Sequence, residues 1–259
     1  MSQRGVTKLV SGRVAVSRTV LSSVEVHGAE VAQELTDILF PQGPPATLTV
    51  SGLLDALHGA LRSAADVMAE ADVAHAQELS DDDAPRVARE AGVAALRAQM
   101  IGLRTTFTTV YGTSILGAYG LGGETPEDAE KLLQRVAGTA QLLKSRPIIE
   151  PPRQVGITID APALGDALFA TAAELRAALA DVRREEREAQ ITLARRDEAV
   201  AMWNKRYQGV ADIITGIYEL VGRADLADRV RPTARRRAGL VEEADTAPAP
   251  TPPAPTNPA

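Results

Sequence analysis

Apolar residues recur at alternating intervals of three and four positions along the second half of the chain. The regular run consists of Val200, Trp203, Tyr207, Val210, Ile214, Ile217 and Val221. The same register continues towards the N-terminus through Leu193, Ala189, Val182, Leu179 and Leu175. This heptad spacing places one apolar stripe along a helix, and such a stripe packs against other helices. Residues 162–222 therefore predict a helical bundle or coiled coil and an all-α fold.

Two arrangements of residues 162–222 fit this pattern. The stretch has no proline after Pro162 and no glycine between Gly165 and Gly209, so one helix of about 60 residues is consistent with it. Glu186 and Arg196 would then lie on the apolar seam and weaken it. The alternative is a helical hairpin with its tip near residues 191–197. Because helices in globular proteins average about 12 residues, we favour the hairpin.

The first half of the chain repeats the pattern weakly. Residues 48–50 and 157–159 are both short alternating apolar segments, and residues 53–57 resemble residues 164–168. At one fixed offset, Val93, Leu96, Met100, Leu103, Phe107, Val110 and Tyr111 match Val200, Trp203, Tyr207, Val210, Ile214, Ile217 and Tyr218. The offset changes near residues 80–85, which fits an exposed turn. We expect duplicated helical hairpins that form an antiparallel four-helix bundle or a long coiled coil, with short extended segments before each copy that pair as a ribbon.

Helix signals and breakers divide the chain into four parts. Further helices are predicted over residues 17–40, from Ser51 to the break at residues 80–85, from there to the glycines at 120–123, over 125–146, and over 222–231. Thr125 suits an N-cap and Pro126 the first helical position. The predicted parts are an N-terminal basic segment and helix (1–45), a first helical repeat (46–146), a second repeat packed on it (147–231), and a disordered tail rich first in arginine and then in proline and alanine (232–259).

Composition narrows the classes of function. Among 259 residues, aromatic side chains make up only 3 %, so alanine, leucine and valine must form the core. The net charge of -6 argues against a nucleic-acid binder. Without cysteine, no disulfide or thiolate site can form. Residues 1–24 have the composition of a transit peptide but lack the apolar block of a secretory signal, and we expect an ordinary basic helix face in a cytoplasmic protein.

Candidate catalytic groups are few. The chain has three histidines, His27, His58 and His75, and one partial metal pattern formed by Asp72, His75 and Glu78. A di-iron bundle needs a second histidine pattern of this kind, and the second repeat supplies no histidine. No nucleophile elbow or phosphate-binding loop is present in the sequence. We therefore expect no enzyme, no cofactor, no bound metal and no small-molecule substrate.

Residues 105–123 carry no charge, although they are rich in threonine and glycine. One interpretation is a segment that enters a bilayer, as in helical pore-forming toxins. It is too polar for a stable span by itself. We favour a central helix buried on all sides, and keep a membrane-active protein as the alternative function.

Arginines gather before the tail at Arg229, Arg231, Arg235, Arg236 and Arg237. Acidic residues follow directly, so a solvated charge run is the simpler interpretation. We expect a non-enzymatic helical scaffold or protein-interaction module that binds a protein partner or associates with itself through the heptad seams. The candidate interaction residues are Trp203, Tyr207, Tyr218, Phe107, Tyr111, Arg235, Arg236 and Arg237.

Overall fold

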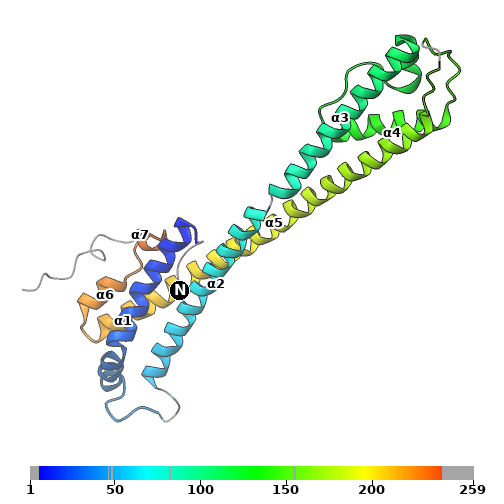
Figure 1. Cartoon of the computed structure of the whole chain (residues 1–259). Helices are drawn as coiled ribbons and strands as arrows, with labels where there is room; N and C mark the ends of the chain where they lie inside the picture. The colour runs from blue at the N-terminus through cyan, green and yellow to red at the C-terminus, as the bar shows by residue number, and fades with distance from the viewer. Residues whose placement is uncertain (1–5, 46, 48, 82, 154–155, 241–259) are drawn as a thin grey trace, which may run out of the picture. The chain divides into compact units, whose positions relative to one another are not determined.

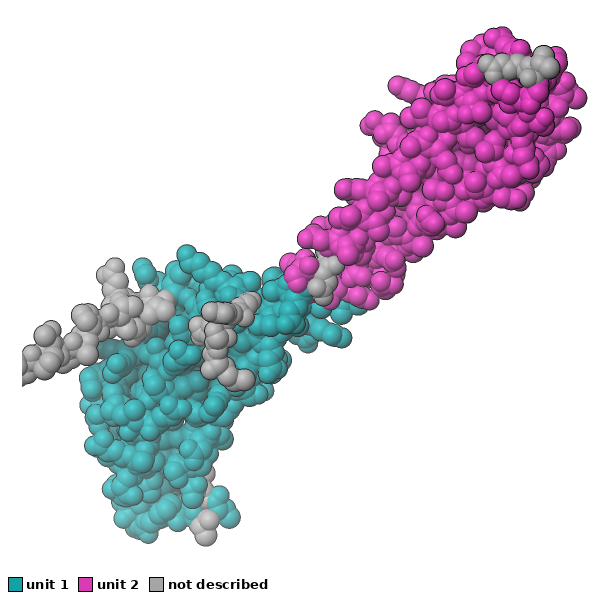
Figure 2. All heavy atoms as spheres, in the orientation of Figure 1, with its two compact units in different colours: residues 1–77, 190–259 teal, residues 78–189 magenta. Residues whose placement is uncertain are grey.

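The computed structural model describes residues 6–45, 47, 49–81, 83–153 and 156–240, and these residues contain helices and no strand. The predicted all-α fold is therefore confirmed (Figure 1). The chain divides into two compact units (Figure 2). Unit 1 combines residues 1–77 with 190–259, and unit 2 comprises residues 78–189.

Unit 1 is built on three long helical segments. They are α1 (Lys8–Leu39), residues 50–77 of α2 (Val50–Asp81), and residues 190–220 of α5 (Ala161–Leu220). Two short helices, α6 (Ala224–Val230) and α7 (Ala234–Arg237), follow and contact α1. Apolar side chains of the three long segments form one core, which contains the α5 seam from Trp203 to Tyr218.

Hydrogen bonds inside this core position α1 against α5. The Trp203 Nε1–H donates to Ser17 Oγ at 2.8 Å, and Ser17 Oγ donates to the Arg13 carbonyl at 3.0 Å. One turn further along α5, the Tyr207 ring stacks on Trp203 with a centroid separation of 5.0 Å. Ser17 and Trp203 are both buried, and an unpaired donor or acceptor at such a place costs free energy.

A buried carboxylate caps the start of α1. Asp72 of α2 is 1 % exposed, and it accepts hydrogen bonds from the Thr7 backbone N–H at 2.5 Å and the Thr7 hydroxyl at 3.0 Å. Thr7 is the N-cap of α1, so a carboxylate from another helix pairs with the backbone N–H of the cap residue and meets the positive end of the helix dipole. One turn further along α2, His75 Nδ1 lies 3.0 Å from Thr192 Oγ1 of α5.

Unit 2 packs α3 (Asp83–Tyr111), η1 (Thr113–Tyr119) and α4 (Ala129–Ser145) around residues 161–189 of α5. Its core contains the seam from Leu96 to Tyr111 together with apolar residues of α4 and α5. α3 ends where Gly112 takes a φ of 94°, a conformation that favours glycine. The following 3₁₀ turn carries Ile115 and Tyr119 into the core.

The favoured hairpin within residues 162–222 is wrong, because α5 is one helix of 60 residues. The absence of breakers and the preserved seam outweigh the general preference for short helices. The expected weakening of the seam is present: from residue 183 to residue 198, no α5 residue is buried. This interval includes Glu186 and Arg196 and spans the division between the two units.

The expected ribbon is also wrong. Val50 is the first residue of α2, residues 157–160 have no regular structure, and no strand is present among the described residues. Most of the turn expected at residues 80–85 is helical instead, because α2 ends at Asp81 and α3 begins at Asp83, and residue 82 lies outside the described residues. Pro85 is tolerated because it lies in the first turn of α3, where backbone N–H groups have no helical partner.

Three smaller predictions need correction. The first helix begins at Lys8, not residue 17, so its basic residues belong to a folded element. The N-cap of α4 is Asp128, whose side chain accepts the Lys131 N–H at 2.9 Å, and Thr125 lies outside that helix. Residues 105–123 do not form one helix buried on all sides, since α3 ends at Tyr111. Most of the predicted disordered tail, residues 241–259, lies outside the described residues.

Replacing Ser17 by alanine should destabilise unit 1 by about 1–3 kcal/mol, because the buried Trp203 N–H loses its acceptor. Urea denaturation followed by tryptophan fluorescence measures this, since Trp203 is the single tryptophan of the chain. Ser22→Ala on the same helix is the control. The exposed Ser22 hydroxyl bonds only its own helix, so its loss should stay within about 0.5 kcal/mol. Equal losses in the two variants would contradict a role for the Ser17 acceptor.

Asp72→Ala should lower the free energy of unfolding of unit 1 by about 1–2 kcal/mol, as the loss of a helix cap does. The same fluorescence measurement applies. Asp66→Ala is the matched control, because Asp66 is an exposed acid of the same helix. If Asp72→Ala proved no more destabilising than Asp66→Ala, the carboxylate cap would contribute nothing to stability.

Ionisation of Tyr218 should lower the stability of unit 1 at alkaline pH. Burial raises the pKa of its hydroxyl above the ordinary value near 10. Its contribution is therefore complete below pH 10 and is lost as the pH rises through the folded-state pKa. Stability measured between pH 9 and pH 12 should fall less in Tyr218→Phe than in the unchanged chain. A parallel decline in both proteins would assign the pH dependence to other groups.

Candidate functional site

The predicted aromatic interaction residues lie inside the two units. Trp203, Tyr207 and Tyr218 belong to the core of unit 1, while Phe107 and Tyr111 belong to the core of unit 2. Tyr111 is the most exposed of the five, at 9 %. The heptad seams are therefore used for packing within the chain, and an interaction surface must be sought elsewhere.

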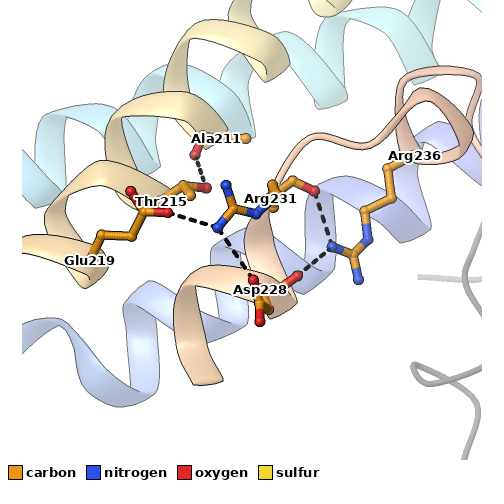
Figure 3. Close-up of polar contacts among 6 residues, drawn as sticks. All are labelled: Ala211, Thr215, Glu219, Asp228, Arg231 and Arg236. Carbon is orange, nitrogen blue, oxygen red and sulfur yellow. Dashed lines mark hydrogen bonds and ion pairs between the residues drawn. The ribbon is translucent and has the colours of Figure 1, made fainter. Parts of the chain in front are cut away.

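Two arginines of the cluster at residues 229–237, Arg231 and Arg236, make polar contacts within unit 1 (Figure 3). Arg231 pairs with Glu219 of α5 at 2.7 Å and with Asp228 at 3.3 Å. Arg236 is 3 % exposed and donates to the backbone carbonyls of Asp228 and Arg231, both at 3.1 Å. Arg236 thus joins α7 to the end of α6, whereas Arg235 and Arg237 face solvent.

The three residues of the partial metal pattern are not brought together as a ligand set. Asp72 caps α1 and His75 contacts Thr192, as described above. Among the described residues, the acids whose oxygens lie within 4.8 Å of one another are Glu78, Glu185 and Glu188. Glu185 also accepts a hydrogen bond from Arg184, and the group is partly exposed, a common setting for acidic side chains without a metal.

The uncharged segment 105–123 is part of the unit 2 fold. Threonine hydroxyls on its exposed side donate to carbonyls one turn earlier, as Thr105 does to Ile101 and Thr109 does to Thr105. Its larger apolar side chains, including Phe107 and Tyr119, are buried in the core. In the part of the chain that the structure describes, no helix combines the length and apolar character needed to cross a bilayer.

A groove of about 460 Å³ lies between α2 and α5 in unit 1. Its lining consists of Leu57, Ala60, Met202, Lys205, Arg206, Gly209, Val210 and Ile213. Low numbers on α2 face high numbers on α5, since Leu57 lies with Ile213 here and His75 lies with Thr192 further along. The two helices are therefore antiparallel, and the groove runs between them.

The groove belongs to a second apolar stripe beside the buried seam. On α2 the stripe contains Leu53, Ala60 and Val67, spaced by seven residues; on α5 it contains Met202 and Gly209, also seven apart, together with Ile213 and Leu220. Exposed fractions are 46 % for Leu53, 43 % for Val67, 44 % for Met202 and 46 % for Ile213. Each helix thus has an apolar arc wider than its own bundle covers. The seven-residue spacing was a signal available in the sequence.

The charged residues that line the groove are all positive. Lys205 and Arg206 are the charged lining residues, and no acid lines it. Among the described residues, neither cation forms an ion pair or a side-chain hydrogen bond. Two unpaired cations beside an exposed apolar stripe form a surface suited to an amphipathic partner. We call this surface, made of the groove lining with Leu53 and Val67, the α2–α5 groove.

Two other hollows each contain a polar side chain that bonds to another group of the chain. Between α1 and α2, a pocket of about 350 Å³ contains His58 Nε2 at 3.0 Å from Glu25 Oε1. In unit 2, a glycine-lined hollow of about 360 Å³ contains Arg135. That guanidinium donates to the carbonyls of Gly120, Gly122 and Glu124, so it secures the loop before α4.

The described residues thus contain a groove that can accept apolar side chains and negative charge. The polar side chains Asp72, His75 and Arg236, which lie apart from it, make structural contacts. Comparisons with protein-family models, with curated proteins and with solved structures find no match to this chain.

Proposed function

We propose that this protein is a non-enzymatic helical module that binds another protein through the α2–α5 groove. The observation that carries the proposal is the exposed apolar stripe on both sides of the groove, with Met202 44 % and Ile213 46 % exposed. Apolar surface at regular helical spacing gains free energy when a partner covers it. In this proposal the exposed stripe beside the heptad seams forms the binding surface, and the buried seams do not.

The contacts that the polar side chains make within this protein favour a binding function over catalysis. A catalytic site needs an acid, a base or a nucleophile directed at a shared cavity. Here the buried Asp72 caps a helix, and His58 and His75 each contact one polar side chain. Such contacts stabilise a scaffold that presents a surface.

We also infer that the chain arose from two related helical blocks. The matched positions support this, because Leu96 to Tyr111 are buried in the core of unit 2 and Trp203 to Tyr218 in the core of unit 1. Each block supplies the seam for one core. In unit 1, the α2 and α5 segments additionally carry the exposed stripe of the α2–α5 groove.

A photo-cross-linking amino acid at position 202 should capture a protein partner in cells that make the chain. Met202 is large and half-exposed at the groove, so an aromatic cross-linker fits there without entering the core. The measurement is the appearance of discrete cross-linked species after irradiation, identified by mass spectrometry.

Ile191 is the matched control position. It lies on α5 within unit 1, is 51 % exposed, and does not line the groove. Partner capture specific to position 202 would support the proposal. Equal capture at both positions, or none at 202, would refute binding through this groove. A cross-linked product of twice the chain mass would show that the partner is a second copy of this chain.

A further inference from the structure

We propose that the α2–α5 groove takes an amphipathic helix of another protein, one whose apolar stripe is flanked by aspartate or glutamate. This inference rests on the proposed function and names the partner that the groove fits. Four properties of the groove carry it: its length, its shape, the small residues in its lining and its charge.

The length and shape of the stripe match a helix. On α2 the apolar positions extend from Leu53 to Val67, which corresponds to about 21 Å at 1.5 Å per residue. They lie in two rows, one on each of two antiparallel helices, with a concave groove between the rows. A helix that presents apolar residues at intervals of three and four positions fits between such rows, as in other helix-in-groove complexes. It would add a fourth long helical segment to the three of unit 1.

Small residues in the lining leave room for a large side chain of the partner. Ala60 on α2 and Gly209 on α5 both line the groove. A Cβ atom added at Gly209 would meet no other atom within 4 Å. We therefore expect a leucine, methionine or phenylalanine of the partner helix to lie over Gly209, as a knob in the hole between neighbouring side chains.

Charge selects among apolar helices. Lys205 and Arg206 line the groove without an acidic neighbour in the lining, and both side chains are exposed. Acidic residues beside the partner's apolar stripe would lie close to these cations. Lysine or arginine at the same places would be repelled. Because the pairs remain near solvent, the charges contribute selectivity more than affinity.

The same charges argue against a second copy. In a two-fold symmetric dimer centred on the groove, the same surface lies on both sides of the interface. Lys205 and Arg206 would then face their own counterparts. A membrane surface is less suitable as well, because the apolar rows border a concave groove and a bilayer offers no rod to fill it.

The test uses helix-stapled peptides of about 18 residues, since short unstapled helices are only marginally formed in water. One peptide carries leucine at the apolar positions and glutamate on both flanks; the other replaces every flanking glutamate by lysine. Binding of labelled peptide to the full chain is measured by fluorescence anisotropy. The glutamate peptide should bind at least about fivefold more tightly at low salt, and the preference should shrink at high salt.

Two pairs of variants locate the binding. Lys205→Glu with Arg206→Glu should reverse the peptide preference, whereas Arg235→Glu with Arg237→Glu changes the net charge equally away from the groove and should preserve it. Gly209→Leu should abolish binding by filling the hole. Gly59→Leu is its control, because position 59 is also open to added atoms but does not line the groove. Circular dichroism shows whether each variant keeps its helices.

Several outcomes would overturn the inference. Equal binding of the two peptides, or binding unaffected by the Lys205 and Arg206 reversals, would remove the charge selection. Failure of both peptides, together with concentration-dependent dimerisation or co-sedimentation with anionic vesicles, would assign the groove to a second copy or to a lipid surface. If both peptides failed while position 202 still captured a protein, the proposed function would stand and the acidic helix would be wrong. If neither occurred, both proposals would fall.

Discussion

Burial of the apolar seam of α5, in two stretches on either side of residues 183–198, is the constraint on which the fold depends. Most helical stability in proteins comes from packing an apolar face against other elements, and the 60-residue helix α5 carries such a face. α5 obtains those contacts from different helices along its length. Its first part is covered by α3 and α4 in unit 2, and its last part by α1 and α2 in unit 1. Between residues 183 and 198 no α5 residue is buried, and the division between the units falls there.

Polar groups inside unit 1 give that packing a defined register. Apolar contacts alone tolerate sliding of one helix along another, but a buried hydrogen bond forms at only one position. Ser17 meets the Trp203 N–H, Ser23 meets the Tyr218 hydroxyl, and Asp72 meets the start of α1. Together these contacts determine how far α1 lies along α5 and α2.

The exposed apolar residues that α2 and α5 carry beside their buried seam connect the fold to the proposed function. A helix in a two-helix contact needs apolar residues at only two positions of each heptad, whereas α2 and α5 carry a further row. That row remains exposed at the α2–α5 groove and lies next to Lys205 and Arg206. An exposed apolar surface of this kind lowers solubility, and it contributes binding free energy when a partner covers it. The proposed amphipathic partner would cover the apolar rows and neutralise Lys205 and Arg206.

The sequence by itself determined the helical class, the seams and their main buried residues, because a spacing of three and four positions is a local property of the chain. Trp203, Tyr207, Phe107 and their neighbours were recognisable as seam residues without coordinates. The tertiary structure decided what those seams pack against. It showed one helix, Ala161–Leu220, in place of the favoured hairpin, and a first helix that begins at Lys8. It also showed that the candidate interaction aromatics are core side chains. It also divided the arginine cluster, burying Arg236 and leaving Arg235 exposed. The physical reason is that periodicity shows which side of a helix is apolar, whereas the share of that side that becomes buried depends on which helices, distant in the sequence, come to lie against it.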